Sequence, residues 1–198
     1  YEKNKDLSCV DSLVYRNAGI KCSGRACRIA DIDELPYPAW DLVPLENYLS
    51  RHLNYHVKRG RTMPIMATRG CPYNCTFCSS SNMWRGRWIA RDPVRITEEM
   101  RFYIQKYRID NFIFSDLTVV VDKKAITRLC EEIIKNKFGV TLQMPALRTE
   151  VLDRGLLRLM YLAGCRDINF AIESGSGVPG QRLHPTSCPA GPGRPPAA

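Results

Sequence analysis

The stretch Ile65-Met66-Ala67-Thr68-Arg69-Gly70-Cys71-Pro72-Tyr73-Asn74-Cys75-Thr76-Phe77-Cys78 places three cysteines in the spacing C-x3-C-x2-C after a short apolar run. Three thiolates this close in sequence can face one small volume, which indicates a metal site. A structural zinc site normally takes a fourth Cys or His, and an ordinary ferredoxin cluster takes four thiolates. Three ligands without an obvious fourth favour a cluster that keeps one iron open, as catalytic metal sites do. Disulfides fit poorly, because three is odd and C-x2-C is a strained bridge.

The motif resembles the hallmark of the radical S-adenosylmethionine (SAM) superfamily, in which an aromatic residue precedes the last cysteine, as Phe77 does here. The resemblance implies that Cys71, Cys75 and Cys78 hold three irons of a [4Fe-4S] cluster and that SAM chelates the fourth. In that family an electron passed through the cluster cleaves SAM, and the 5'-deoxyadenosyl radical abstracts a hydrogen atom from the substrate.

Outward from the motif, the pattern alternates between short apolar runs and amphipathic stretches. We expect strands over 65–69, 111–115, 140–144 and 166–172, with a long loop between the cysteines and residue 96. We expect one helix capped by Thr97, a second capped by Asp122 and ended at Gly139, and a third that opens at Thr149 and ends at Gly164. Near-continuous apolar strands alternating with helices predict an α/β fold with a parallel sheet. The resemblance implies a partial radical SAM barrel of about four parallel strands.

Polar residues lie just after the expected strands, at their carboxyl ends, where parallel sheets collect their chemistry. The cysteine loop, Asp116, the 144–148 stretch and Glu173 all fall at this edge. Each of the two acidic side chains could instead be a helix cap or a loop residue, and Arg148 could be a surface cation.

The family resemblance implies roles for these positions around SAM. Phe114-Ser115-Asp116 is similar to the start of the family's F-x-D-D-x-F, and only Asp116 carries over, near the methionine end of SAM. The stretch 170–176 looks like F-G-I-E-S-G-S, which assigns Glu173 and Ser174 to the ribose or amino end. Phe77 would lend backbone atoms to the adenine, and Arg148 is a further candidate for cofactor binding.

The amino-terminal 62 residues differ in composition from the rest of the chain. Residues 1–34 are polar, with an apolar piece at Leu13–Tyr15 and a hairpin-turn composition at Asn17-Ala18-Gly19. Residues 35–62 start with three prolines in nine residues, which predicts an extended connector that buries Leu35, Trp40 and Leu42. This connector resembles the linker of the cobalamin-dependent branch of the superfamily. By that resemblance, residues 1–34 are the remnant of a preceding cobalamin-binding domain, and cobalamin would enter only through a domain missing from this chain.

The resemblance implies that residues 63–177 form the partial radical SAM core. Composition predicts that the Pro/Gly-rich residues 178–198 are disordered. The family barrel has six strand-helix units, so four strands predict a truncated member.

The net charge of +9 lies entirely between residues 51 and 108, a stretch that contains twelve Lys or Arg and three acidic residues. Such a field can steer an acidic partner towards the cysteines, and a flavodoxin or ferredoxin that donates the electron is our expectation. Nucleic acid is the competing partner, which we do not favour, and a solvated basic surface is the alternative. The sequence shows no signal peptide or transmembrane segment, and Cys130 and Cys165 fit buried apolar positions, so we expect a cytoplasmic protein.

Three functions are compatible with these patterns. The leading one is a radical SAM enzyme of the cobalamin-dependent type, which methylates or rearranges an unactivated carbon of a small-molecule substrate. The second is an RNA-modifying methylthiotransferase, which would need an RNA-binding module that the sequence does not show. The third is a non-catalytic iron-sulfur or zinc-binding module.

Overall fold

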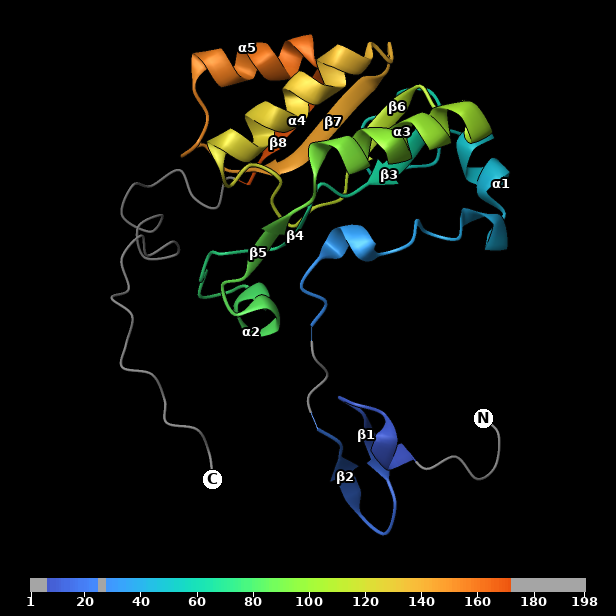
Figure 1. Cartoon of the computed structure of the whole chain (residues 1–198), viewed down its shortest axis with the longest axis vertical. Helices are drawn as coiled ribbons and strands as arrows, with labels where there is room; N and C mark the ends of the chain where they lie inside the picture. Colours follow the sequence, from blue (N-terminus) through green and yellow to red (C-terminus); the bar gives the residue numbers. More distant parts are fainter. Residues whose placement is uncertain (1–6, 25–27, 172–198) are drawn as a thin grey trace. The chain divides into compact units, whose positions relative to one another are not determined.

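The computed structural model describes residues 7–24 and 28–171, and the chain divides into two units, residues 1–34 and 35–198. Figure 1 traces the chain from one end to the other. The expected disorder of residues 178–198 lies outside the described residues. Within the described ranges, no helix combines the length and the apolar character that crossing a bilayer requires.

The first unit holds a small hairpin between two short 3-10 helices, η1 (Leu7–Cys9) and η2 (Ile32–Glu34). Strands β1 (Val14–Arg16) and β2 (Ile20–Cys22) pair antiparallel. Asn17 N–H donates to Gly19 O at 2.9 Å, while Ala18 and Gly19 both have positive φ. The predicted hairpin turn is therefore confirmed.

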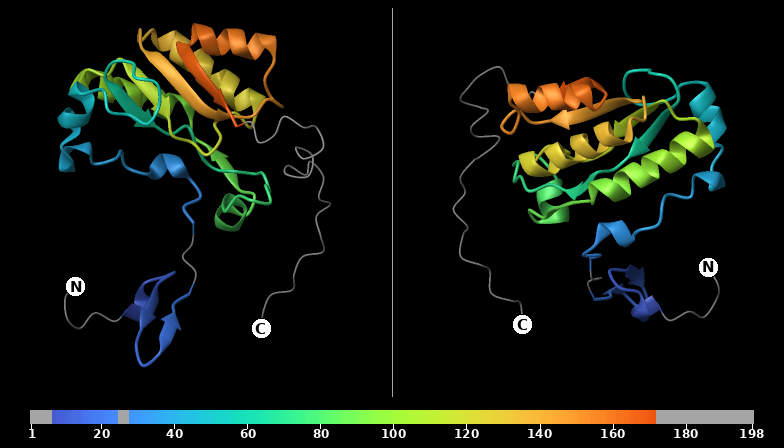
Figure 2. Two further views of the ribbon diagram at one scale, coloured as in Figure 1. Left: turned by 180° about the vertical axis from the view of Figure 1, so that it is seen from behind. Right: turned by 45° about the horizontal axis from the view of Figure 1, so that its top comes forward.

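The second unit is built on a four-stranded parallel sheet. Strands β3 (Thr62–Ile65), β6 (Asn111–Phe114), β7 (Thr141–Leu147) and β8 (Cys165–Phe170) lie in the order β3-β6-β7-β8. Helices α3 (Pro93–Tyr107), α4 (Lys123–Asn136) and α5 (Arg154–Leu162) cover one face of this sheet, as Figures 1 and 2 show. The predicted α/β fold with four parallel strands is confirmed.

The core lies between the sheet and these helices. All four residues of β6 are buried, as a strand in the middle of a parallel sheet requires. One stripe of α4 is buried against the sheet, and Cys130 and Cys165 are buried apolar side chains as expected. The buried members of the stripe are Ile126, Leu129, Cys130 and Ile133.

The segment 54–59 lies against the sheet face that the helices leave open. Leu142 and Met144 pack in the helix-side core, so Gln143 between them points to the other face. There its Nε2 donates to Val57 O at 2.8 Å. His56 Nε2 lies 3.2 Å from Asp167 Oδ1 on β8.

Two helices begin at a different residue from the one we predicted. Helix α3 starts at Pro93, because the Asp92 carboxylate accepts from Val94 N–H at 2.9 Å and caps the first turn. Thr97 lies inside that helix. Helix α5 starts at Arg154 rather than at Thr149, because Asp153 accepts from Leu156 N–H at 2.8 Å. Asp122 caps α4 as predicted.

The strand expected over 65–69 is in fact two strands. Strand β3 ends at Ile65, and β4 (Thr68–Gly70) pairs antiparallel with β5 (Trp88–Ala90) in a separate two-stranded sheet. The predicted long loop after the cysteines therefore contains helix α2 (Ser80–Trp84) and strand β5. The hairpin pairing of β4 with β5 closes this segment on itself.

Strand β7 runs past Pro145, where we expected it to end. The pairing of β7 with β8 shifts register between Met144 and Leu147. Proline is tolerated in a sheet at such irregularities, because a ladder hydrogen bond is already missing there.

The connector 35–62 is less extended than predicted. It contains the 3-10 helix η3 (Trp40–Leu42) and helix α1 (Leu45–Ser50), which starts directly after Pro44. Trp40 packs against the core and Leu35 is partly buried, but Leu42 is 81% exposed. The residues after Pro44 include no further proline until Pro64, which leaves a helical turn possible.

Candidate metal centre

The cysteine loop begins where β4 ends, at the carboxyl edge of the sheet. Gly70 has φ +94°, and a Cβ there would lie 2.1 Å from the carbonyl oxygen of Arg87 on the return arm of the hairpin. Only glycine allows this close approach, since its neighbour is backbone and cannot move aside. The hairpin therefore fixes the start of the loop at Cys71.

The three cysteines of the loop are thiols rather than disulfides, and each is partly buried. Cys78 N–H donates to Cys75 O at 3.1 Å, and Ser80 N–H donates to Cys78 Sγ at 3.5 Å. Burial raises the pKa of the Cys71 thiol; a backbone hydrogen bond at Tyr73 opposes this, and charge on Cys75 and Cys78 raises it further. These thiols thus influence one another electrostatically.

The donor set fits an iron-sulfur cluster. Thiolates are the ligands that such clusters take, and they must lose their protons when metal binds. Among residues 7–24 and 28–171, no three His, Cys, Asp or Glu side chains are gathered as they would be around a single metal ion. The fit with a cluster therefore rests on the chemistry of the three thiols and their spacing in the sequence.

Asp116 lies two residues after the end of β6 and joins the sheet to the start of the cysteine hairpin. Its carboxylate accepts from Ala67 N–H at 3.2 Å, from Thr68 N–H, and from the Thr68 hydroxyl at 2.5 Å. Burial raises the pKa of Asp116 to about 6, although the hydrogen bonds from Thr68 and Ala67 and the charge of Arg91 oppose the increase. The structure therefore places Asp116 against the backbone that separates β3 from β4.

A buried ion pair attaches the same hairpin to α3. Arg91 Nη1 lies 2.6 Å from Glu99 Oε2, and it also donates to Met66 O at 2.9 Å. The Tyr103 hydroxyl donates to the other Glu99 oxygen at 2.8 Å. Burial, together with the Glu99 carboxylate, raises the pKa of Tyr103. This network holds the segment between β3 and β4 from the helix side.

Arg148 comes from the end of β7 and reaches the cysteine loop. Its guanidinium carbon lies 3.8 Å from the centroid of the Tyr73 ring, and its Nη1 lies 3.9 Å from Cys75 Sγ. The side chain also donates from Nε to Glu150 Oε1 at 3.0 Å. We expected Arg148 to be either a site residue or a surface cation. In the structure it contacts the candidate metal centre.

From two neighbouring strand ends, the structure thus brings Arg148 to the cysteine loop and Asp116 to the backbone just before it. Phe77 is 55% exposed at the loop surface, and its contact with adenine stays a prediction. Glu173 and Ser174 lie outside the described residues. Sequence reasoning missed the residues that support the loop, namely Thr68, Tyr73, Arg91, Glu99 and Glu150. Of these, only Tyr73 had a sequence signal, which was its position inside the cysteine motif.

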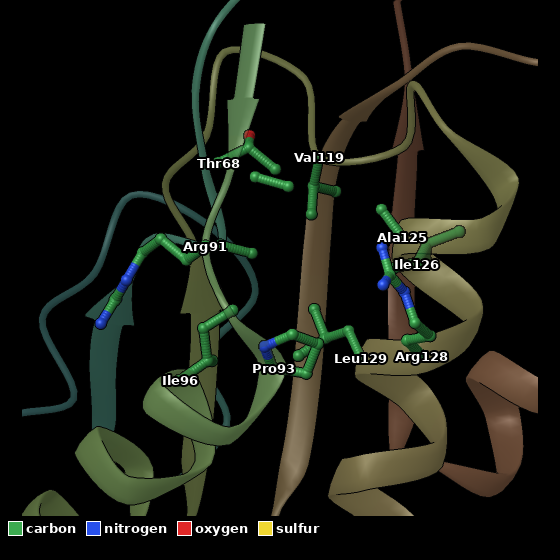
Figure 3. A pocket seen from close by; sticks show the side chains of 11 residues that line it. Thr68, Arg91, Pro93, Ile96, Val119, Ala125, Ile126, Arg128 and Leu129 are labelled. Atoms are coloured by element: carbon green, nitrogen blue, oxygen red, sulfur yellow. The ribbon is translucent and has the colours of Figure 1, made fainter. Parts of the chain in front are cut away.

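A pocket lies beside this network, between α3 and α4. Figure 3 shows Ile96 from α3, Ile126 and Leu129 from α4, and Thr68 and Val119 at one end; Arg128 of α4 also lines the pocket. Arg91 lines it but extends away from it in this view. None of the predicted site residues that the structure describes lines this pocket, and neither does any residue of the cysteine loop.

Comparison with curated proteins finds relatives along most of the chain. The chain is 28% identical over 175 residues to an uncharacterised methyltransferase of Pyrococcus horikoshii, which covers 88% of this chain and 36% of that protein. It is 30% identical over 172 residues to the anaerobic magnesium-protoporphyrin IX monomethyl ester cyclase of Rubrivivax gelatinosus, which covers 85% of this chain and 30% of the cyclase. The chain therefore spans about a third of the length of these relatives.

Solved structures share the fold. The cobalamin-dependent SAM radical enzyme OxsB superposes with a TM-score of 0.69 at 17% identity, over 90% of this chain and 26% of that one. The radical SAM methyltransferase TsrM of Kitasatospora setae, solved with cobalamin and a [4Fe-4S] cluster, superposes with a TM-score of 0.60 at 16% identity, over 84% and 34%. A family model described as the radical SAM superfamily matches residues 65–184, which is more than half of the chain. The chain belongs to the radical SAM superfamily.

Proposed function

We propose that the protein binds a [4Fe-4S] cluster through Cys71, Cys75 and Cys78 and takes part in SAM-dependent radical chemistry on an unactivated carbon of a small molecule. The observation that carries the proposal is the loop itself. Three partly buried thiols stand in C-x3-C-x2-C spacing at the carboxyl edge of a parallel sheet. Membership of the radical SAM superfamily implies the cluster and SAM.

The chain's own residues hold and orient the loop. The three thiols would take the cluster, and Asp116 and Arg91 fix the backbone from which the loop starts. When bound, a cluster of this kind supplies the electron for reductive cleavage of SAM. The protein contributes the position of the sulfurs, their surroundings and the exclusion of water.

The relatives support a finer assignment. One is named a methyltransferase and another a cyclase, so methylation or rearrangement of a carbon skeleton is the class of reaction we propose. Both similar structures are of cobalamin-dependent or cobalamin-bound enzymes. We therefore propose that the complete protein uses cobalamin, which residues outside this chain would bind.

Anaerobic reconstitution with iron and sulfide tests the cluster. We expect about four irons per chain and a broad visible charge-transfer band. The variant Cys75→Ala should lose most of the iron and the band. Cys22→Ala is the matched control, because Cys22 is an exposed free thiol outside the loop, and it should behave as wild type.

Two results would overturn the proposal. One is full cluster content in Cys75→Ala. The other is a wild-type protein that takes a single zinc ion and no iron, which would indicate a structural metal module instead.

A further inference from the structure

Arg148 touches the candidate metal centre in two ways. Its guanidinium lies over the ring of Tyr73, which sits between the first two cysteines, at 3.8 Å from the centroid. The same group lies 3.9 Å from Cys75 Sγ, within hydrogen-bonding range of a sulfur acceptor. A flat cation stacked on a ring is well defined in position, since the guanidinium is planar and permanently charged.

The cation is also well shielded from water. The Arg148 side chain is 15% exposed, whereas that of its partner Glu150 is 47% exposed. Solvent therefore weakens the field of the Glu150 carboxylate more than that of the guanidinium. The more buried of the two charges is therefore the positive one, and it lies 3.9 Å from the Cys75 sulfur.

We propose that Arg148 is a positioning residue that raises the reduction potential of the cluster through Cys75. This inference rests on the proposed cluster at Cys71, Cys75 and Cys78. On reduction the cluster gains one electron and becomes more negative by one unit of charge. A positive charge and an N–H donor at one of its sulfurs stabilise that reduced form, because cluster potentials depend on hydrogen bonds to the sulfurs and on net charge.

A redox titration of the reconstituted full chain, with dithionite as the electron donor, measures this effect. Arg148→Gln should lower the equilibrium constant for one-electron reduction about tenfold, which is about 59 mV towards more negative potential. Glu150→Gln should shift the potential in the opposite direction, because it removes the opposing carboxylate. Arg158→Gln is the matched control for charge, since Arg158 is exposed on α5, a helix that packs on α4 and β8, and it should leave the potential unchanged.

The opposite signs separate tuning from simple support of the loop. If Arg148 only held the loop in shape, Arg148→Gln and Glu150→Gln would both lose iron, and neither would shift the potential of the cluster that remains. A potential in Arg148→Gln equal to that of Arg158→Gln would overturn the inference. That result, obtained with a full cluster in the wild type, would leave the proposed function intact. A wild type that assembles no cluster would overturn the proposed function itself.

A second variant covers the case in which Arg148→Gln assembles no cluster. Arg148→Lys keeps the charge and loses the flat, stacked fork. We expect it to keep a potential near that of wild type while releasing iron to a chelator several times faster. The inference is wrong if the potential of Arg148→Lys falls by about 59 mV, the shift expected for loss of the charge. It is also wrong if Glu150→Gln leaves the potential unchanged.

Discussion

The carboxylate of Asp116 shows how one side chain can define the start of a site. It accepts from two consecutive backbone N–H groups, those of Ala67 and Thr68, at the point where β3 gives way to the hairpin. The break takes these donors out of the parallel ladder, so Asp116 completes the hydrogen bonding there. The cysteines begin three residues after Thr68, and their position depends on this contact.

Asp116 also predicts a pH dependence of stability. Its pKa is about 6 in the folded chain, against an ordinary value of 3.8, because of burial. Between these two values the folded chain keeps a proton that the unfolded chain has lost. Raising the pH through this window therefore weakens the folded state, by up to about 3 kcal/mol at this one group.

Urea unfolding of the metal-free chain between pH 4 and pH 6.5 checks this prediction. Asp116→Asn has no proton to lose, so its free energy of unfolding relative to wild type should rise with pH across the window. Thr68→Val removes a donor that favours the ionised carboxylate, so it should raise the pKa of Asp116 further and extend the dependence to higher pH. A difference between Asp116→Asn and wild type that stays constant with pH would contradict the account.

The sequence predicted which single residues matter at the strand ends, but it did not predict what each of them contacts. Asp116 and Arg148 were found because polar residues after buried strands are conspicuous, but a carboxylate at a strand end serves a ligand or a backbone break equally well. The contact of Asp116 with SAM stays a prediction. The position of Tyr73 inside the cysteine motif was its only sequence signal, and Glu150 carried none towards the site. The importance of both comes from Arg148, which follows Tyr73 by 75 residues.

At the scale of elements, the hairpin β4–β5 depends on Gly70. A Cβ at this residue would strike the Arg87 carbonyl at 2.1 Å and would also need a left-handed φ of +94°. We expect Gly70→Ala to cost more than about 2 kcal/mol of stability and to reduce cluster content. Gly139→Ala is the control, because Gly139 has a similar φ of +71° but open space around it, and it should cost only about 1 kcal/mol. Equal losses of unfolding free energy in the two variants would show that the close approach is unimportant.

The attachment of this hairpin to α3 gives another prediction. Arg91 and Glu99 form a buried pair with side chains 12% and 6% exposed, whereas Arg95 and Glu98 form an exposed pair one turn away. Arg91→Ala leaves the Glu99 charge buried without its cation, and we expect it to cost about 3–5 kcal/mol. Arg95→Ala should cost less than about 1 kcal/mol. Thermal or urea unfolding of both variants measures the difference, and similar losses would refute the role of Arg91.

Element boundaries were predicted less well than element types. The strands and the main helices were found because their apolar periods persist over several residues. Strand β6 matches to within one residue, and α4 begins as predicted but ends at Asn136 rather than at Gly139. The starts of α3 and α5 were missed because Thr97 and Thr149 are good caps by residue type, while Asp92 and Asp153 are the ones whose carboxylates reach the first N–H groups. The break between β3 and β4 was missed because Asp116, 48 residues away from Thr68, stabilises it.

At the scale of the whole molecule, the topology was predicted from the alternation of strands and helices. The structure adds which arginines of the basic region 51–108 are paired and which are exposed. Three of its arginines pair with glutamates: Arg61 with Glu46, Arg91 with Glu99, and Arg95 with Glu98. Others are exposed on the segment that carries the cysteines, namely Arg69, Arg85 and Arg87. The acidic electron donor stays a prediction, and these three residues are where we expect it to bind.

The central claim is that three thiolates of one loop hold a cluster whose remaining iron is open to SAM. The most direct measurement is the EPR spectrum of the reduced, reconstituted protein recorded with and without SAM. We predict that SAM changes the spectrum of the wild-type chain, because its amino and carboxylate groups bind the open iron. An unchanged spectrum at saturating SAM, in a protein with a full cluster, would contradict the account.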